Sequence, residues 1–224
     1  MKEIRVYFEG GSNYVDRKKE MRISIDQEDG KPSIRRMIRE KDRKKAMRKG
    51  MSQFLNQMRE EYGEGHIKCI ACGSNFETYS NFKKSLEDYP NAFNILLVDS
   101  DSHVRSAPWD YVLERFGWGK GNCVDEQCHL MVQLMESWII SDITALKGFY
   151  GPKFIESDIP DVDDVETLDG THIKDSLKKA TRRTEKKGYR KRHASEILMK
   201  MNPSTVRGKA SHCDRLFKVL ESII

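Results

Sequence analysis

The feature that constrains the fold most is a nearly continuous apolar run, residues 93–98, which ends at Asp99-Ser100-Asp101. A strand with one solvated face alternates apolar and polar side chains, whereas this run is apolar toward both faces. Such runs are typical of strands buried between helices in a parallel sheet. We therefore expect an α/β fold in which this strand is central and both aspartates follow its carboxyl end.

Three further segments have strand character. Residues 4–8 alternate before Glu9-Gly10, residues 66–71 precede Gly73, and residues 128–133 form a fourth apolar segment. Helical patterns lie between most of these segments. The order predicts a mostly parallel four-stranded sheet with helices on its faces.

The first of these helices is expected within residues 33–62. Apolar side chains recur there at spacings of three and four, from Met47 to Met58, which gives one apolar face. Gly50 interrupts that face at a cost of ~1 kcal/mol against Ala. We therefore expect a break or a close contact at Gly50.

Other segments have clearer boundaries. Ser74 and Glu77 form a capping box that opens a helix ending near residue 89. A single helix is expected over residues 135–150, whereas residues 102–126, rich in Trp, Gly and Pro, are expected to be a loop.

The predicted organisation is a metal-binding domain over residues 1–150 and a helical C-terminal region over residues 151–224 packed on it. The domain carries a basic helical insertion at about residues 31–62. The C-terminal region begins with an acidic loop, residues 156–166, for which a solvated linker is the default interpretation.

The net charge of +5 conceals a strong asymmetry. Residues 31–50 and residues 174–193 each contain ten basic and two acidic side chains, so each segment carries +8 and the remainder sums to −11. Localised basic charge on an acidic body favours a polyanionic partner, nucleic acid first, although two solvated helix faces would give the same pattern. The residues we expect to contact phosphate are Arg48, Lys49, Arg190 and Arg192.

Composition and short motifs also limit the location and the class of protein that we expect. No apolar run approaches the ~20 residues that span a bilayer, and the N-terminus lacks a signal pattern, so we expect no membrane association and a cytoplasmic location. Five cysteines fit free thiols. Cys69 and Cys72 would lie on opposite faces of a strand, so burial is favoured over zinc binding. The chain has no Gly-Lys-Ser/Thr phosphate loop, so it is not itself expected to be a P-loop ATPase.

Acidic residues follow three of the four expected strands: Glu9, Asp99, Asp101 and Glu136. The carboxyl ends of parallel strands meet at one edge of the sheet, where ligands of open α/β folds bind. Gathering these charges is unfavourable unless a cation neutralises them, and oxygen-only ligands suit Mg²⁺ or Mn²⁺. The alternative is that aspartates after a strand only cap turns and helices.

These motifs together resemble the Toprim fold of topoisomerases, DnaG-type primases and overcoming-lysogenization-defect (OLD) nucleases. The pattern Glu-Gly after the first strand and Asp-x-Asp after the third carries the likeness. Further short segments resemble a bacterial family of small Toprim-like proteins. They are residues 48–54, 71–74, 129–133 and 135–138. That resemblance covers residues 4 to about 217 and implies a partner ATPase and a role in antiviral defence.

The resemblance implies a role for each matching residue. Glu9, Asp99 and Asp101 would hold metal, and Glu136 in Glu-Ser-Trp-Ile would serve a second ion. Lys191 would stabilise negative charge in the transition state. Where OLD-type enzymes often have a second acid after the first glutamate, this chain has Ser12-Asn13, which puts a fully occupied two-metal site in doubt.

The leading hypothesis is a Mg²⁺- or Mn²⁺-dependent nuclease that hydrolyses DNA or RNA. One ion, held by Glu9 and Asp99, would activate water, and a second, shared by Asp101 and Glu136, would stabilise the leaving oxygen. The alternative is a non-catalytic Toprim-like subunit that binds nucleic acid or docks to a partner. The sequence leaves a homo-oligomer open.

Overall fold

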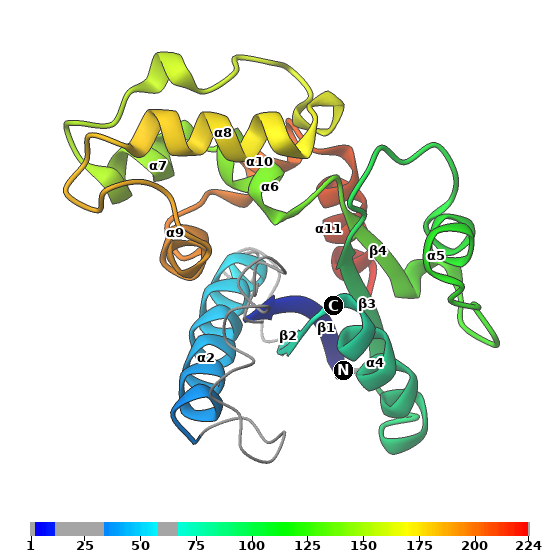
Figure 1. Ribbon diagram of the computed structural model, residues 1–224. Helices are drawn as coiled ribbons and strands as arrows, with labels where there is room; N and C mark the ends of the chain where they lie inside the picture. Colours follow the sequence, from blue (N-terminus) through cyan, green and yellow to red (C-terminus); the bar gives the residue numbers. More distant parts are fainter. Residues whose placement is uncertain (1–2, 12–33, 58–66, 224) are drawn as a thin grey trace.

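The computed structural model describes residues 3–11, 34–57 and 67–223. Its centre is a sheet of four parallel strands: β1 (Ile4–Gly11), β2 (Ile67–Gly73), β3 (Phe93–Asp99) and β4 (Cys128–Met131). Their spatial order is β2-β1-β3-β4 (Figure 1). The predicted α/β class with a parallel four-stranded sheet is therefore confirmed.

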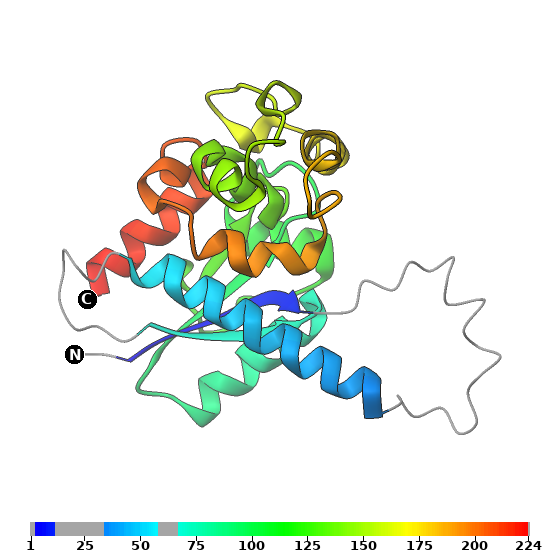
Figure 2. The ribbon, with the colours of Figure 1, turned by 90° about the vertical axis from the view of Figure 1, so that its left-hand side faces the viewer.

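Helices cover both faces of the sheet. Helix α2 (Ile34–Asn56) connects β1 to β2 and covers one face (Figure 2). Helices α4 (Asn75–Asp88) and α5 (Pro108–Phe116) follow β2 and β3 and cover the other face. Strands β2 and β3 lie on opposite sides of β1, so the connection from β1 to β2 and the connection from β2 to β3 run in opposite directions across the sheet. Right-handed crossovers therefore place α2 and α4 on opposite faces.

The apolar core is divided by the sheet into two clusters. Val6 and Phe8 of β1 meet Met51 and Phe54 of α2 in the first cluster. The second cluster packs β3 and β4 against α4 and α5. Cys69 and Cys72 are buried in different clusters, as strand alternation predicts, and all five cysteines are free and buried.

The chain after β4 is helical. Helices α6 (Met135–Ser141) and α7 (Ile143–Tyr150) precede residue 151, and the C-terminal region contains α8 (Gly170–Thr181), α9 (Ala194–Leu198), α10 (Pro203–Arg207) and α11 (Ser211–Ile223). Leu177, Leu198 and Phe217 belong to the same apolar cluster as the sheet residues Val6 and Phe8. The two predicted regions therefore share one core, and a domain boundary at residue 150 stays a prediction.

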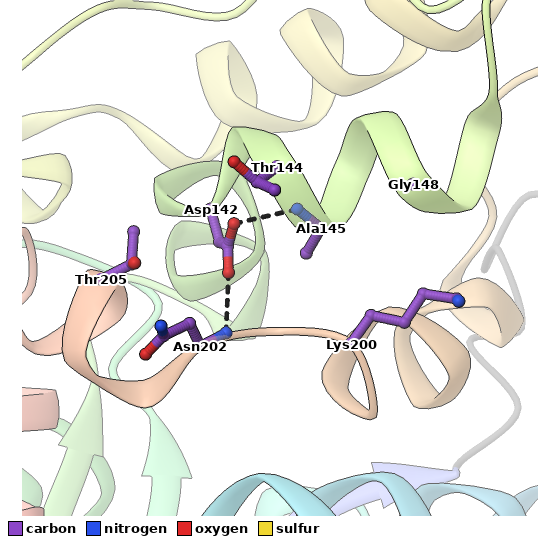
Figure 3. Close-up of a pocket in the computed structure, with 7 residues that line it drawn as sticks. All are labelled: Asp142, Thr144, Ala145, Gly148, Lys200, Asn202 and Thr205. Atoms are coloured by element: carbon purple, nitrogen blue, oxygen red, sulfur yellow. Dashed lines mark hydrogen bonds between the residues drawn. The ribbon is translucent and has the colours of Figure 1, made fainter.

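The prediction of a single helix over residues 135–150 is wrong, because the helix is interrupted at Asp142, between α6 and α7. One carboxylate oxygen of Asp142 accepts a hydrogen bond from the Ala145 amide at 2.9 Å, which caps α7 (Figure 3). The other accepts one from the Asn202 amide at 2.7 Å, before α10. Asp142 thus holds three helices together beside an open hollow of about 310 Å³.

The loop expected over residues 102–126 is also wrong in part, because it contains α5. Pro108 occupies the first turn of that helix, where its missing N–H is not needed, and Gly117 ends the helix in the left-handed conformation. Trp109 packs in the core and donates its indole N–H to the Val124 carbonyl. The predicted capping box at Ser74 and Glu77 is confirmed.

The close contact expected at Gly50 is confirmed. A Cβ atom at Gly50 would lie 2.9 Å from Cα and 3.0 Å from the carbonyl carbon of Ser195, in α9. Helices α2 and α9 therefore cross with their backbones nearly touching (Figure 2). The predicted insertion at residues 31–62 extends beyond α2, and its ends, like Ser12-Asn13, lie outside the described residues.

Among the described helices, none has both the length and the apolar character that a membrane span requires.

Candidate active site

The candidate site lies at the point where the strand order reverses. From β1 the chain proceeds to β2 on one side, and from β3 it proceeds to β4 on the other. Ligands of open α/β sheets bind beyond the carboxyl ends of such a strand pair. Glu9 lies near the end of β1, and Asp99 is the last residue of β3. The topology therefore brings these two predicted site residues to one position.

Glu9 lies in an irregular part of β1. Glu9, Gly10 and Gly11 all pair with Gly73 of β2, so the regular register is lost there. Such a bulge redirects side chains relative to the alternation of a regular strand. Gly10 also packs closely, since a Cβ there would lie 3.2 Å from the Phe8 ring and 3.3 Å from the Met47 methyl group. The sequence Glu-Gly-Gly thus combines an acidic side chain with a bulge.

The environment of Glu9 disfavours its charge. Burial raises the pKa of Glu9 to about 7. Lys191 and a backbone hydrogen bond from Asp99 lower that pKa, whereas Asp101 and Glu136 raise it. Every other predicted catalytic residue therefore affects the pKa of Glu9, although these residues come from distant parts of the sequence.

Asp99 is buried and ties the sheet to α6. Its Oδ1 atom accepts a hydrogen bond from the Met135 amide at 2.9 Å, so the next residue, Glu136, is positioned at the same rim. Burial raises the pKa of Asp99 well above its usual range, and the carboxylates of Glu9 and Glu136 raise it further. Carboxylates that raise one another's pKa in this way are stabilised by a nearby cation.

Asp101 occupies the turn that leaves β3. The residue is exposed and has a φ of 58°, a left-handed conformation that Asp adopts more readily than most residues. Its amide donates to the Gln133 carbonyl at 2.8 Å, which fixes the turn against the chain leaving β4. The Gln133 side chain in turn contacts His103 and donates to the Leu168 carbonyl.

Glu136 and Lys191 complete the group. Glu136 is buried in the first turn of α6, and its Oε1 atom accepts a hydrogen bond from the Tyr189 hydroxyl at 3.0 Å. Burial lowers the pKa of Lys191, but four carboxylates raise it more, Glu136 most strongly, so its pKa is raised overall. Although Lys191 is exposed as a whole residue, its ammonium group interacts with all four predicted metal-binding acids.

The side chains do not yet form a coordination shell. Within residues 3–11, 34–57 and 67–223, no three His, Cys, Asp or Glu side chains are gathered closely enough to hold a metal ion. The chemistry of the donors nevertheless fits a hard divalent cation, because all four are carboxylates, two of which have raised pKa values. Binding would require side-chain movement that draws these oxygens together.

The four basic residues predicted to contact nucleic acid are exposed. Arg48 and Lys49 lie on α2, and Arg190 and Arg192 flank Lys191. The two basic segments are far apart in sequence, but α2, which carries most of the first, packs on α9, which directly follows the second.

Sequence analysis missed Tyr189, the residue that contacts Glu136. Tyr189 stands within a run of basic residues, and the charge of this run led us to predict only phosphate contacts for the segment around Lys191. His193, in the same segment, is buried and its Nδ1 atom lies 3.0 Å from the Tyr150 hydroxyl, so it supports the fold. His129 is likewise buried, and burial beside Arg215 lowers its pKa to about 3.

Fold and site define an α/β protein with a carboxylate cluster and one lysine at the switch point of a parallel sheet. The chain belongs to the family described as Domain of unknown function (DUF4276), whose model matches residues 16–221. No curated protein and no solved structure shows significant similarity to it.

Proposed function

We propose that this protein is a Mg²⁺- or Mn²⁺-dependent nuclease of the Toprim type. The single observation that carries the proposal is that Glu9, Asp99, Asp101, Glu136 and Lys191 lie near enough to one another at the switch point of the sheet to shift the pKa values of Glu9, Asp99 and Lys191. These residues come from β1, β3, the turn after β3, α6 and the turn before α9, so their proximity depends on the whole fold. Two of the four acids, Asp99 and Glu136, are buried, and gathering carboxylates there is unfavourable unless a cation neutralises them.

The carboxylates would hold the cation, which when bound activates water and polarises the scissile phosphate. Lys191 would place a positive charge beside the same phosphate and stabilise the negative charge that grows on its oxygens. Arg48, Lys49, Arg190 and Arg192 would contact neighbouring phosphates. Contacts of this kind provide affinity without sequence preference and weaken steeply with salt.

The resemblance to small Toprim-like proteins adds a setting to this proposal. We place the protein in a bacterial antiviral defence system with a partner ATPase, because the chain carries no phosphate-binding loop of its own. Five free, buried cysteines support a reducing cytoplasmic location.

A non-catalytic subunit that binds nucleic acid or a partner is the second candidate. It is favoured by one observation: among the described residues, no three candidate ligands are already gathered for a metal ion. In that case the exposed basic residues would still bind phosphate, but the acids would only repel the backbone at the rim.

A cleavage assay separates the two functions. Purified protein is incubated with plasmid, single-stranded DNA and tRNA in Mg²⁺ or Mn²⁺, for the wild type and for Asp99→Asn. Asp110→Asn, which changes an exposed carboxylate on α5, is the matched control. The nuclease predicts cleavage by the wild type and the control that is lost in Asp99→Asn and in EDTA. Binding without cleavage, equal in all three proteins, would support the non-catalytic subunit.

A further inference from the structure

The segment that carries Lys191 presents a second group to the site. Arg190 has extended backbone angles, φ −138° and ψ 143°. In extended backbone, residues two apart point to the same side. Tyr189 and Lys191 therefore share one side of this segment, and both interact with Glu136.

The contact between Tyr189 and Glu136 is direct and shielded. The Tyr189 hydroxyl donates to Oε1 of Glu136 at 3.0 Å, and Glu136 itself is 4% exposed. The Tyr189 ring packs edge-on against the buried His193, with 6.3 Å between ring centres, and this packing restricts movement of the phenol ring. The hydroxyl is thus fixed while it orients one carboxylate oxygen.

We propose that Tyr189 is a positioning residue that holds the Glu136 carboxylate in the orientation required to bind a divalent cation. The proposal rests on the proposed function of this site. With Oε1 engaged by the phenol, the orientation of Oε2 is fixed as well, and Glu136 would bind through that oxygen. Partners behind metal-binding side chains typically contribute 10–100-fold to metal affinity.

Tyr189→Phe removes the hydroxyl and leaves the ring. Mn²⁺ binding to the full chain is measured by isothermal titration calorimetry, which does not depend on activity. Tyr150→Phe is the matched control, because Tyr150 is a buried tyrosine whose hydroxyl lies 3.0 Å from Nδ1 of His193, and it makes no described hydrogen bond to Glu136. We expect a 10–100-fold higher Kd in Tyr189→Phe and an unchanged Kd in Tyr150→Phe.

A double-mutant cycle tests whether Tyr189 acts through Glu136. If it does, adding Tyr189→Phe to Glu136→Ala changes the Mn²⁺ affinity no further. An unchanged Kd in Tyr189→Phe, or an equal loss in Tyr150→Phe, would overturn the positioning role while leaving the proposed nuclease intact. Absence of Mn²⁺ binding by the wild type would overturn both.

Discussion

The contact between α2 and α9 gives the sharpest prediction of stability. Gly50→Ala adds one methyl group that would lie 2.9 Å from Cα and 3.0 Å from the carbonyl carbon of Ser195. Carbon atoms normally approach to about 3.5–4.0 Å, so the overlap is about 0.5–1 Å. Because the obstructing atoms are backbone, no side-chain rotation relieves it, and the helices must separate.

The magnitude follows from two opposing terms. Forced overpacking of this kind costs about 1–3 kcal/mol, and a backbone obstacle favours the upper half of that range. Replacing Gly by Ala within a helix recovers ~1 kcal/mol. We therefore expect Gly50→Ala to lower the free energy of unfolding by about 1–2 kcal/mol, which for a chain of this size lowers the Tm by about 2–8 °C.

The matched control is Gly148→Ala. Gly148 is exposed in α7, and nothing lies within 4 Å of the added methyl group, so only the helix-propensity gain applies. We expect this variant to be more stable than the wild type by up to ~1 kcal/mol. Urea titration followed by circular dichroism measures both variants. A Gly50→Ala protein as stable as Gly148→Ala would refute the interpretation of the contact.

Three further predictions concern buried carboxylates. Burial raises the pKa of Glu166, but hydrogen bonds from His212 lower it more, so the pKa is lowered overall. The charged Glu166 therefore stabilises the fold above pH 4.5, the ordinary pKa of the group. This stabilisation is lost as the pH falls through the lowered pKa of the folded state. Glu166→Gln should flatten that acid limb of the Tm profile, and an unchanged limb would exclude Glu166. Asp142→Ala removes two backbone hydrogen bonds and should cost about 2 kcal/mol in urea titration, whereas a loss under ~0.5 kcal/mol would contradict its capping role. Asp99→Asn keeps the shape of the side chain but removes both the cost of burying a carboxylate and its repulsion by Glu9. The metal-free variant should therefore melt higher than the wild type by differential scanning fluorimetry, and a lower Tm would show that the charge stabilises the fold.

The sheet and the helices with strong local signals could be predicted from the sequence. Residues 93–98 could form little other than a buried strand, and the Ser74–Glu77 box fixed the start of α4. The break at Asp142 could not be predicted, because the apolar pattern continues through it. At the break, Asp142 accepts a hydrogen bond from the amide of Asn202, sixty residues away. Likewise α5 was missed because Trp, Gly and Pro residues obscure its short apolar pattern.

The proximity of the predicted site residues follows from the strand order, whereas their individual contacts do not. The rule that ligands bind at strand ends identified Glu9 and Asp99, since it depends only on strand order. The link between Asp99 and α6 depends on one amide, that of Met135, which no side-chain pattern reveals. The role of Tyr189 was hidden for the same reason: its partner lies 53 positions away.

If Glu9, Asp99, Asp101 and Glu136 close around a divalent cation, as we propose, the ion can be located directly. The measurement is the anomalous difference map of a crystal grown with Mn²⁺. We expect a peak between the ends of β1 and β3, with carboxylate oxygens of at least two of these residues at about 2.0–2.3 Å. A fully occupied Mn²⁺ elsewhere on the chain, with these carboxylates still apart, would contradict it.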